Sequence, residues 1–356
     1  MPPPREAINL CDLSDAPAAA GGRVDLNRVG LVVIGRNEGW RLRRCLETAL
    51  RQTNRIVYVD SGSTDGSPEL SRRLRLPVVE LSPKLPFSAA RARNAGLERL
   101  LKLYPNVEYV QFIDGDCEID AGWLARGIAR LDASPRLAAV AGRCRERFPN
   151  RTIYHRLCQI EWDVPTGEAR ACGGNSMMRI AAFREAGGFN PAVIAGEEPE
   201  LCARLRQCGW SLWRADAEMV SHDADMARFS QWWWRAVRSG YAYAQGAALH
   251  GNASERHCVR ESRSIWFWGF YLPVAALAPA WPTGGLSLLL FAGYLLLAWR
   301  IRRHCRQRSL GTTDTRLYTA FTILGKFPQL LGQCKFHADR LLGRTPRIIE
   351  HKNPAS

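Results

Sequence analysis

The stretch YVQFIDGDCEID (residues 109–120) joins a run of strand-forming residues to a cluster of carboxylates. Its first half is typical of a buried strand, and Asp114 and Asp116 follow where that strand ends. Because alternate strand residues point to the same side, we expect both carboxylates to face one site, with Gly115 allowing a bend between them. Two oxygen ligands suit Mg²⁺ or Mn²⁺, with phosphate oxygens and water completing the shell. The alternative is a solvated acidic loop that caps a helix.

Apolar runs alternate with helical patterns on both sides of this stretch. The expected strands are GLVVIG (30–35), RIVYVD (55–60), PVVEL (77–81) and YVQFID (109–114). Helices are expected over 42–50, after an N-cap at Ser67, from Ser88, and from about Ala121. This alternation predicts an α/β fold with a mostly parallel sheet. Such sheets bind ligands beyond the carboxyl ends of their strands, and polar groups follow those ends at 36–38, 60–66 and 114–116.

The composition adds a strong positive charge. The chain has 356 residues and a formal net charge of +15, which predicts an anionic partner such as nucleic acid, anionic lipid or a phosphorylated substrate. Its 11 cysteines lack the spacing of a disulfide framework, so we expect reduced thiols. Residues 1–27 lack the apolar core of a secretory signal and are expected to form a flexible arm.

The character of the chain changes after residue 225. Residues 226–263 are aromatic and basic, and 265–299 contain no charged residue. A Pro-Thr-Gly-Gly break at 282–285 leaves two halves that are each shorter than the ~20 residues of a spanning helix. Basic residues flank the run, which places both of its ends on the cytoplasmic side. We therefore expect a hairpin at 264–301 that enters or barely crosses the cytoplasmic membrane. The alternative is a buried core hairpin.

The C-terminal segment, residues 302–356, is expected to associate with the same membrane. It begins within an arginine-rich stretch at 300–308 and is amphipathic over 316–344. A basic amphipathic helix of this kind is typical of a segment that lies along a membrane surface.

Several motifs in the first two thirds of the chain occur in the order of one known family. They are VVIGRNE, VYVDSGSTDGS, ARARNAG, FIDGDCEI, GGNSMMR, GGFNP and GEEPELCARLRQCGW. Together they resemble the family 2 glycosyltransferases, which have a GT-A fold, over about Leu31 to His222. The resemblance implies that residues 28–225 form a GT-A glycosyltransferase domain that binds a nucleotide-sugar.

The resemblance also implies two groups of site residues. Asp60 would hydrogen-bond the nucleotide base, and Asp116 would be the principal acid of a Mg²⁺ or Mn²⁺ site. The implied metal ligands are Asp114, Asp116 and His222, although a lone histidine is more often structural. The implied nucleotide-sugar-binding residues are Asn37, Glu38, Asp60, Asp65, Arg93, Asn94, Asp114, Gly173, Gly174 and Asn175.

A cluster of three glutamates, Glu197, Glu198 and Glu200, opens a helix in GEEPEL. Carboxylates at this position are favourable for the helix dipole, which is the simpler explanation. The resemblance implies instead that the second acid of the cluster, Glu198, deprotonates the acceptor hydroxyl. The family has an aspartate there, so the longer side chain puts the geometry of the base in doubt but keeps its chemistry.

The implied enzyme is an inverting, metal-dependent glycosyltransferase, with UDP the expected carrier of the sugar. The expected hairpin points to a membrane-anchored acceptor such as a polyprenyl-linked saccharide, in exopolysaccharide or envelope glycan synthesis. Processive members of the family carry Gln-x-x-Arg-Trp, whereas residues 231–235 read Gln-Trp-Trp-Trp-Arg. We interpret 231–235 as an aromatic belt at the membrane interface and expect transfer of single sugars, with the catalytic domain facing the cytoplasm.

Other functions explain the sequence less well. A dinucleotide-binding dehydrogenase would need G-x-G-x-x-G after the first strand, where this chain has GRNEGW. A nucleotidyltransferase could use two acids but needs neither GEEPEL nor a membrane hairpin. A non-catalytic membrane scaffold or a nucleic-acid binder leaves the acids at the strand ends without a purpose, so we expect no nucleic-acid partner.

Overall fold

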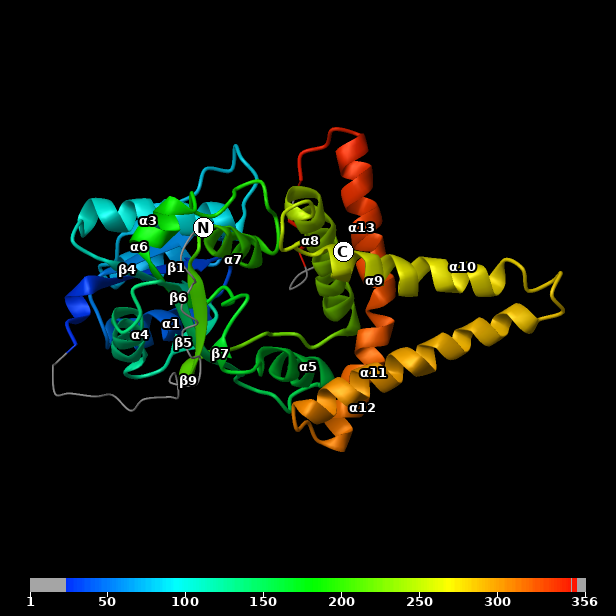
Figure 1. Cartoon of the computed structure of the whole chain (residues 1–356). Helices are drawn as coiled ribbons and strands as arrows, with labels where there is room; N and C mark the ends of the chain where they lie inside the picture. Colours follow the sequence, from blue (N-terminus) through cyan, green and yellow to red (C-terminus); the bar gives the residue numbers. More distant parts are fainter. Residues whose placement is uncertain (1–23, 347, 351–356) are drawn as a thin grey trace, which may run out of the picture.

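The computed structural model describes residues 24–346 and 348–350, so most of the arm expected at 1–27 lies outside the described residues. The last part of that segment is not a flexible arm, because Leu26–Arg28 form a short 3-10 turn, η2. A sheet domain and a group of long C-terminal helices lie side by side (Figure 1). In the described part of the chain, the strands of the sheet are β1 (Val29–Gly35), β2 (Ile56–Asp60), β3 (Val78–Glu80), β4 (Tyr109–Asp114), β5 (Cys117–Ile119), β6 (Leu137–Glu146), β7 (Gly167–Glu168), β8 (Ser176–Arg179) and β9 (Ser211–His222).

The parallel part of the sheet places the predicted polar loops at one edge. Its order is β3-β2-β1-β4, and the register sets Gly35 beside Asp60 and Ile34 beside Asp114. β1 and β2 are buried along nearly their whole length, which explains why both are continuous apolar runs. Beyond β4 the sheet continues through the antiparallel β8 to β6 and β9, which run parallel to each other. The predicted α/β fold with a mostly parallel sheet is confirmed.

The helices of the sheet domain are α1 (Trp40–Leu50), α2 (Ser67–Arg73), α3 (Ala89–Leu103), α4 (Trp123–Asp132), α5 (Ile153–Trp162), α6 (Ile180–Glu185) and α7 (Glu197–Gln207). The helices α1 to α4 and α7 begin at or near the expected residues, whereas α5 and α6 were not predicted. The N-cap of α3 is Ser88, whose Oγ accepts a hydrogen bond from Arg91 N at 3.2 Å. The N-cap predicted at Ser67 is wrong by one residue, because α2 begins at Ser67 and Gly66 precedes it with a φ of +80°.

The C-terminal helices pack on one another through close backbone contacts. They are α8 (Phe229–His250), α9 (Val259–Trp266), α10 (Leu272–Leu277), α11 (Gly293–Gln307), α12 (Thr312–Leu324) and α13 (Lys326–Leu341). α8 and α13 lie against each other (Figure 1), and a Cβ added to Gly332 would lie 2.0 Å from the carbonyl oxygen of Val237. The buried rings of Tyr241 and Phe336 meet edge to face at 5.3 Å. One side of α13 is therefore covered by α8. The expectation that α13 lies along a membrane surface stays a prediction.

The uncharged segment 265–299 is the main part of an arm that projects away from the sheet domain (Figure 1). Its outward side consists of α9, a π-helical turn over Phe267–Tyr271 (η3) and α10, and its return side consists of a 3-10 stretch over Leu286–Ala292 (η4) and α11. Trp281 is 95% exposed and Leu295 is 73% exposed, so the alternative of a buried core hairpin is wrong. Within residues 24–346 and 348–350, no helix combines the length and the hydropathy needed to cross a bilayer.

The start of α8 differs from the aromatic belt expected at 231–235. Gln231 and Trp232 are buried, and the ring of Trp232 packs edge-on against Phe321 of α12 at 4.8 Å. Arg235 forms an ion pair with a glutamate of α5 at 2.7 Å. Consecutive residues of a helix point in different directions, so this run cannot turn all of its side chains toward one membrane surface. The belt is therefore wrong for Gln231, Trp232 and Arg235.

Candidate functional site

A cleft of about 640 Å³ lies between the carboxyl edge of the sheet and α8. Its walls come from the loops after β1 and β4, the starts of α3 and α7, the end of β9, and α8. The predicted site residues that line it are Asn37, Glu38, Arg93, Asp114, Asp116, Gly174, Glu198 and His222. The fold thus brings the predicted base and the predicted metal ligands, which are far apart in sequence, to one cavity. The predicted residues that do not line it are Asp60, Asp65, Asn94, Gly173 and Asn175.

The loop after β1 is held against the loop after β2. Asn37 has a φ of 56°, and its Oδ1 accepts a hydrogen bond from Thr64 N at 2.7 Å. The backbone N–H of Asn37 donates to Ser63 Oγ at 3.0 Å. Asparagine tolerates a positive φ better than most residues, so the residue type suits the turn. Glu38 forms an ion pair with Arg41 at 3.0 Å, and both side chains lie on the wall of the cleft.

Asp60 and Asp65 shape the loop after β2. Asp60 is buried, and its carboxylate accepts hydrogen bonds from the hydroxyl of Tyr58 at 2.9 Å, Gly62 N at 2.9 Å and Ser63 N at 2.8 Å. Asp65 accepts hydrogen bonds from two backbone amides of neighbouring turns. Both side chains therefore have protein partners that fix the backbone, and the contact of Asp60 with a nucleotide base stays a prediction.

Arg93 forms the charged centre of the cleft. It is 2% exposed, and its two terminal nitrogens donate to Asp114 Oδ1 at 2.7 Å and to Glu197 Oε1 at 2.6 Å. Burial alone would lower the pKa of Arg93, but the charges of the two carboxylates outweigh burial and raise it. Burial alone would likewise raise the pKa of Glu197, but the charges of Arg93 and Arg238 outweigh burial and lower it. Arg93 and Glu197 are therefore both charged at neutral pH.

The backbone turn at 173–175 fits closely around this ion pair. A Cβ added to Gly174 would lie 2.6 Å from Arg93 Nη2 and 3.1 Å from Asp114 Oδ2. Asn175 Oδ1 accepts a hydrogen bond from the backbone N–H of Asp114 at 2.9 Å. Gly173 has a φ of +86°, a conformation that favours glycine. The Gly-Gly-Asn sequence therefore serves to position the carboxylate at the end of β4.

Asn94 lies next to Arg93 on α3 but holds a different loop. Its Nδ2 donates to the carbonyl oxygen of Phe189 at 2.7 Å, and its Oδ1 accepts from Phe189 N at 3.1 Å. These two bonds fix the GGFNP segment and place the ring of Phe189 under the guanidinium of Arg93, 5.5 Å from its centroid. Asn94 thus stabilises the segment next to the cleft without lining the cleft itself.

Asp116 and His222 form the part of the cleft that suits a divalent cation. Asp116 Oδ1 lies 3.3 Å from His222 Nε2, and the two meet because β5 pairs with β9 directly after Asp116. Two ligands that are each about 2.1 Å from one octahedral cation lie about 3 Å apart, so this pair fits Mn²⁺ or Mg²⁺. Among the described residues, the ligand atoms gathered here within 4.8 Å belong to Asp116, Cys117 and His222. Asp114 is outside that group and is bound to Arg93.

Glu198 lines the cleft from the first turn of α7. It is 4% exposed, and its Oε1 accepts hydrogen bonds from Cys172 N at 2.5 Å and from the thiol of Cys202 at 2.8 Å. Both hydrogen bonds are accepted by Oε1. Among the described residues, Glu198 has no ion-pair partner. Oε2 is therefore the oxygen that can accept a proton from a hydroxyl group bound in the cleft.

The two neighbouring glutamates have structural partners instead. Glu197 is bound to Arg93, as described above. Glu200 is 1% exposed and is bound to Arg204 at 2.7 Å and to His250 of α8 at 2.7 Å. A role limited to the helix dipole is therefore wrong for both residues, because each is a buried partner in an ion pair.

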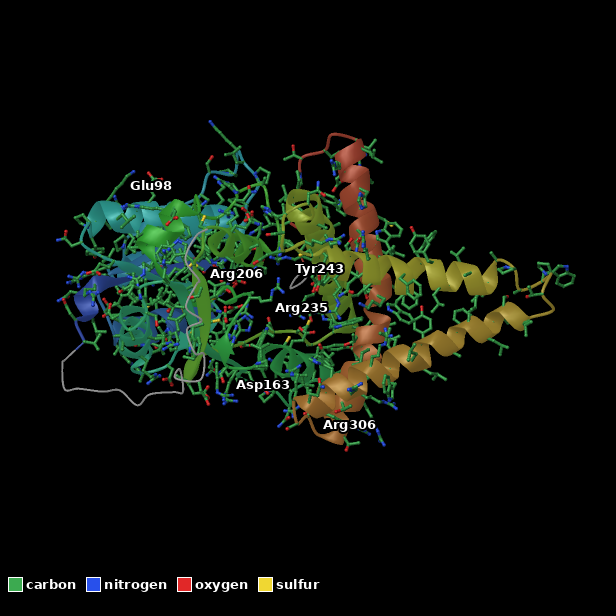
Figure 2. The ribbon with its side chains drawn as sticks, viewed as in Figure 1. Glu98, Asp163, Arg206, Arg235, Tyr243 and Arg306 are labelled. Carbon is green, nitrogen blue, oxygen red and sulfur yellow. The ribbon has the colours of Figure 1, made fainter. Side chains whose placement is uncertain are left out.

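Sequence reasoning missed the contribution of the C-terminal part of the chain to the cleft. Arg235 and Arg238 line it from α8, and Figure 2 labels Arg235 between the sheet domain and the C-terminal helices. Burial lowers the pKa of Arg238, which has no ion-pair partner among the described residues. These two arginines are three residues apart, so they lie on the same face of a helix. That spacing was the signal in the sequence that could have identified them as a pair. At the mouth of the cleft, Arg36 forms an ion pair with Glu350 at 2.5 Å.

Comparisons with known proteins agree with this geometry. Residues 31–187 match the family model described as Glycosyl transferase family 2. The chain is 27% identical over 176 residues to the succinoglycan biosynthesis protein ExoA of Rhizobium meliloti, covering 46% of this chain and 52% of that protein. It is 23% identical over 209 residues to the glycosyltransferase AglE of Haloferax volcanii, covering 55% of this chain and 67% of that protein. It therefore spans only about half to two thirds of these relatives.

A solved structure resembles the chain over most of its length. The mannosyltransferase PcManGT from Pyrobaculum calidifontis, in complex with GDP-Man and Mn²⁺, aligns over 88% of each chain with a TM-score of 0.58 and 19% sequence identity. At this identity the likeness shows the fold, which is the GT-A fold that the motifs predict.

The ion pairs of Arg93 generate a stability prediction. We expect Arg93→Met to lower the free energy of unfolding by about 3 kcal/mol, because methionine removes the ion-pair partner that Asp114 and Glu197 share. This is the lower end for a broken buried pair, since the Asp114 side chain is 31% exposed. Urea denaturation followed by circular dichroism measures the change. Arg99→Met, at an exposed position of the same helix, is the control and should change stability by less than about 0.5 kcal/mol. Equal midpoints for the two variants would contradict the prediction.

Proposed function

We propose that this chain, a member of glycosyltransferase family 2, transfers a single sugar from a nucleoside diphosphate sugar to an acceptor held at a membrane. The observation that carries the proposal is that Glu198, the Asp116–His222 pair and the arginines of α8 line one cleft. The family match over residues 31–187 establishes a glycosyltransferase domain, so the alternatives of a nucleotidyltransferase and a non-catalytic scaffold are set aside.

The donor nucleotide is proposed to enter at the loops after β1 and β2. Asn37 and Glu38 line this side of the cleft and face the nucleoside. Asp116 and His222 would hold a divalent cation, which would supply positive charge to the diphosphate leaving group. UDP is the carrier we expect from the resemblance. A GDP-linked donor is also tested below, because the structurally similar mannosyltransferase was solved with GDP-Man and Mn²⁺.

The residues of the chain account for the remaining steps of a single displacement. The oxygen of the acceptor hydroxyl attacks the anomeric carbon while the bond to the nucleoside diphosphate breaks, which inverts the anomeric centre. Glu198 Oε2 accepts the proton of that hydroxyl. Arg93 holds Asp114 in place at 2.7 Å, so this carboxylate stays fixed beside the sugar and ribose. Arg235 and Arg238 add positive charge to the wall of the cleft and favour anionic substrates there.

The acceptor is proposed to be a membrane-anchored saccharide on the cytoplasmic face of the membrane. The projecting arm supports this, because Leu289 and Leu295 on its return side are 68% and 73% exposed. The arginines at 300–308 follow directly and favour anionic lipid. The relative named for succinoglycan biosynthesis supports a role in exopolysaccharide or envelope glycan synthesis.

Donor binding is tested by thermal shift with a panel of UDP- and GDP-sugars in the presence of Mn²⁺. A competent donor binds the folded state and raises the melting temperature by mass action, and EDTA should remove most of that shift. Asp116→Asn should lose the shift that depends on Mn²⁺. Asp120→Asn is the matched control, because Asp120 belongs to the same acidic run but pairs with Arg126 outside the cleft. Full binding and turnover in EDTA would refute the metal-dependent form of the proposal.

The base is tested by the rate of sugar transfer at saturating donor. Glu198→Gln should reduce this rate by ~10²–10⁴, the usual contribution of a positioned general base, and should leave donor affinity nearly unchanged. Glu198→Asp, which restores the residue found in the family, should keep measurable activity. Glu98→Gln is the control, since Glu98 is an exposed residue of α3 (Figure 2). If Glu198→Gln turns over like the unaltered enzyme, the proton goes to another group.

Membrane association is tested by flotation with vesicles that contain phosphatidylglycerol. The double variant Leu289→Glu/Leu295→Glu should move most of the protein out of the vesicle fraction, because a carboxylate is costly to bury in lipid. Leu85→Glu is the control, since Leu85 is 61% exposed but belongs to the sheet domain. Flotation of the double variant equal to that of the control would show that the arm does not insert.

A further inference from the structure

Three buried side chains from separate segments meet directly behind Asp116 and His222. Glu146 ends β6, His155 lies in α5, and Asp223 follows β9. They are 4%, 0% and 3% exposed, respectively, and their potential ligand atoms all lie within 4.8 Å of one another. No role proposed above uses any of the three, so the presence of this many titratable groups in the interior needs an explanation of its own.

The imidazole of His155 is held by a hydrogen bond to Thr152. Thr152 Oγ1 lies 2.7 Å from His155 Nδ1 and 3.0 Å from the carbonyl oxygen of Met226, and it accepts hydrogen bonds from Tyr154 N and His155 N. In the tautomer that has its proton on Nδ1, Nε2 carries a lone pair. Nε2 is buried and has no hydrogen-bond partner, which is the situation of a histidine whose ligand is missing from the protein atoms.

The two carboxylates also lack a cationic partner. Each oxygen of Glu146 accepts one backbone N–H, from Phe148 at 3.0 Å and from Ala224 at 3.1 Å. Asp223 Oδ1 accepts from Asp225 N at 3.1 Å. Within the described residues neither carboxylate forms an ion pair. Buried carboxylates are costly when they are charged without a counter-ion, and burial raises the pKa of Glu146 to about 7.

We propose that Glu146, His155 and Asp223 bind a divalent transition-metal cation of the Zn²⁺ type, separate from the cation of the sugar-transfer site. One imidazole nitrogen and two carboxylate oxygens form a donor set that such a cation accepts. The hydrogen bond between His155 Nδ1 and Thr152 is the outer contact that would orient a metal-bound histidine. The cation would also supply the positive charge that the two carboxylates lack.

The position of this cluster indicates a structural role. A cation there would join the end of β6, α5 and the segment after β9. That segment is attached to the sugar-transfer site, because Asp223 N donates to the carbonyl oxygen of Asp116 at 3.1 Å and His222 is the preceding residue. The buried cation would thus hold the backbone that carries Asp116 and His222. This inference does not depend on the proposed substrates.

The test measures the metal bound to the protein of residues 1–356 by elemental (inductively coupled plasma) mass spectrometry. The background is Asp116→Asn, which removes the proposed sugar-transfer cation. We expect about one tightly bound cation per chain in this background, and its loss in Asp116→Asn/His155→Asn and in Asp116→Asn/Asp223→Asn. Asparagine at 155 can still donate to Thr152, and asparagine at 223 can still accept from Asp225 N, so both variants preserve the local hydrogen bonds. Asp116→Asn/His337→Asn, altered at an exposed histidine of α13, is the control and should keep the metal.

Two results would overturn the inference. In the first, the Asp116→Asn protein contains no stoichiometric metal, and adding Zn²⁺ or Mn²⁺ to the metal-free protein does not raise its melting temperature. In the second, both cluster variants keep the same metal content as the control. Either result would mean that the cluster holds a proton or a water molecule. If the His155→Asn protein does not fold, the Asp223→Asn protein decides the question by the same two measurements.

Discussion

The cleft depends on one buried arginine that is shared by two carboxylates. Arg93, on α3, reaches Asp114 at the end of β4 and Glu197 at the start of α7, at 2.7 and 2.6 Å. Burying an isolated charge is costly, so the interior position of Arg93 and Glu197 depends on this pairing, which the partly exposed Asp114 completes. Gly174 is part of the same arrangement, because a Cβ there would lie 2.6 Å from the guanidinium. The end of β4 and the start of α7 are therefore held relative to each other by electrostatics.

The sequence predicted the parallel part of the sheet and the polar loops at its edge because both follow from local rules. Continuous apolar runs identified the parallel strands, and the carboxyl ends of parallel strands must share an edge. The role of each side chain did not follow from the sequence. Asp60 and Asn94 belong to family motifs, yet their hydrogen bonds are made within the protein, to the turn after β2 and to Phe189. Whether a polar group faces a cavity or the backbone depends on packing, and the sequence does not show that packing.

The C-terminal half shows a different limit. The absence of charge from 265 to 299 indicated an apolar arm, and its exposure in the structure agrees with that composition. The same reasoning failed for residues 231–235, where composition indicated a belt at the membrane and the structure buries Gln231 and Trp232. Both segments are rich in aromatic residues. The difference is that side chains of α8 contact α5, α12 and α13, and such tertiary partners cannot be derived from composition.

The cleft and the C-terminal helices also depend on each other. Arg235 and Arg238 reach the cleft from α8, and α8 is held by α13 through the close approach of Gly332 to Val237. A truncation that ends before α9 would remove α13 and expose the buried face of α8, so it would alter the cleft as well as any membrane contact. The cleft is therefore not independent of the helices that follow α8. Substitutions on the exposed face of the arm can therefore test any membrane association without altering the cleft, whereas deletions cannot.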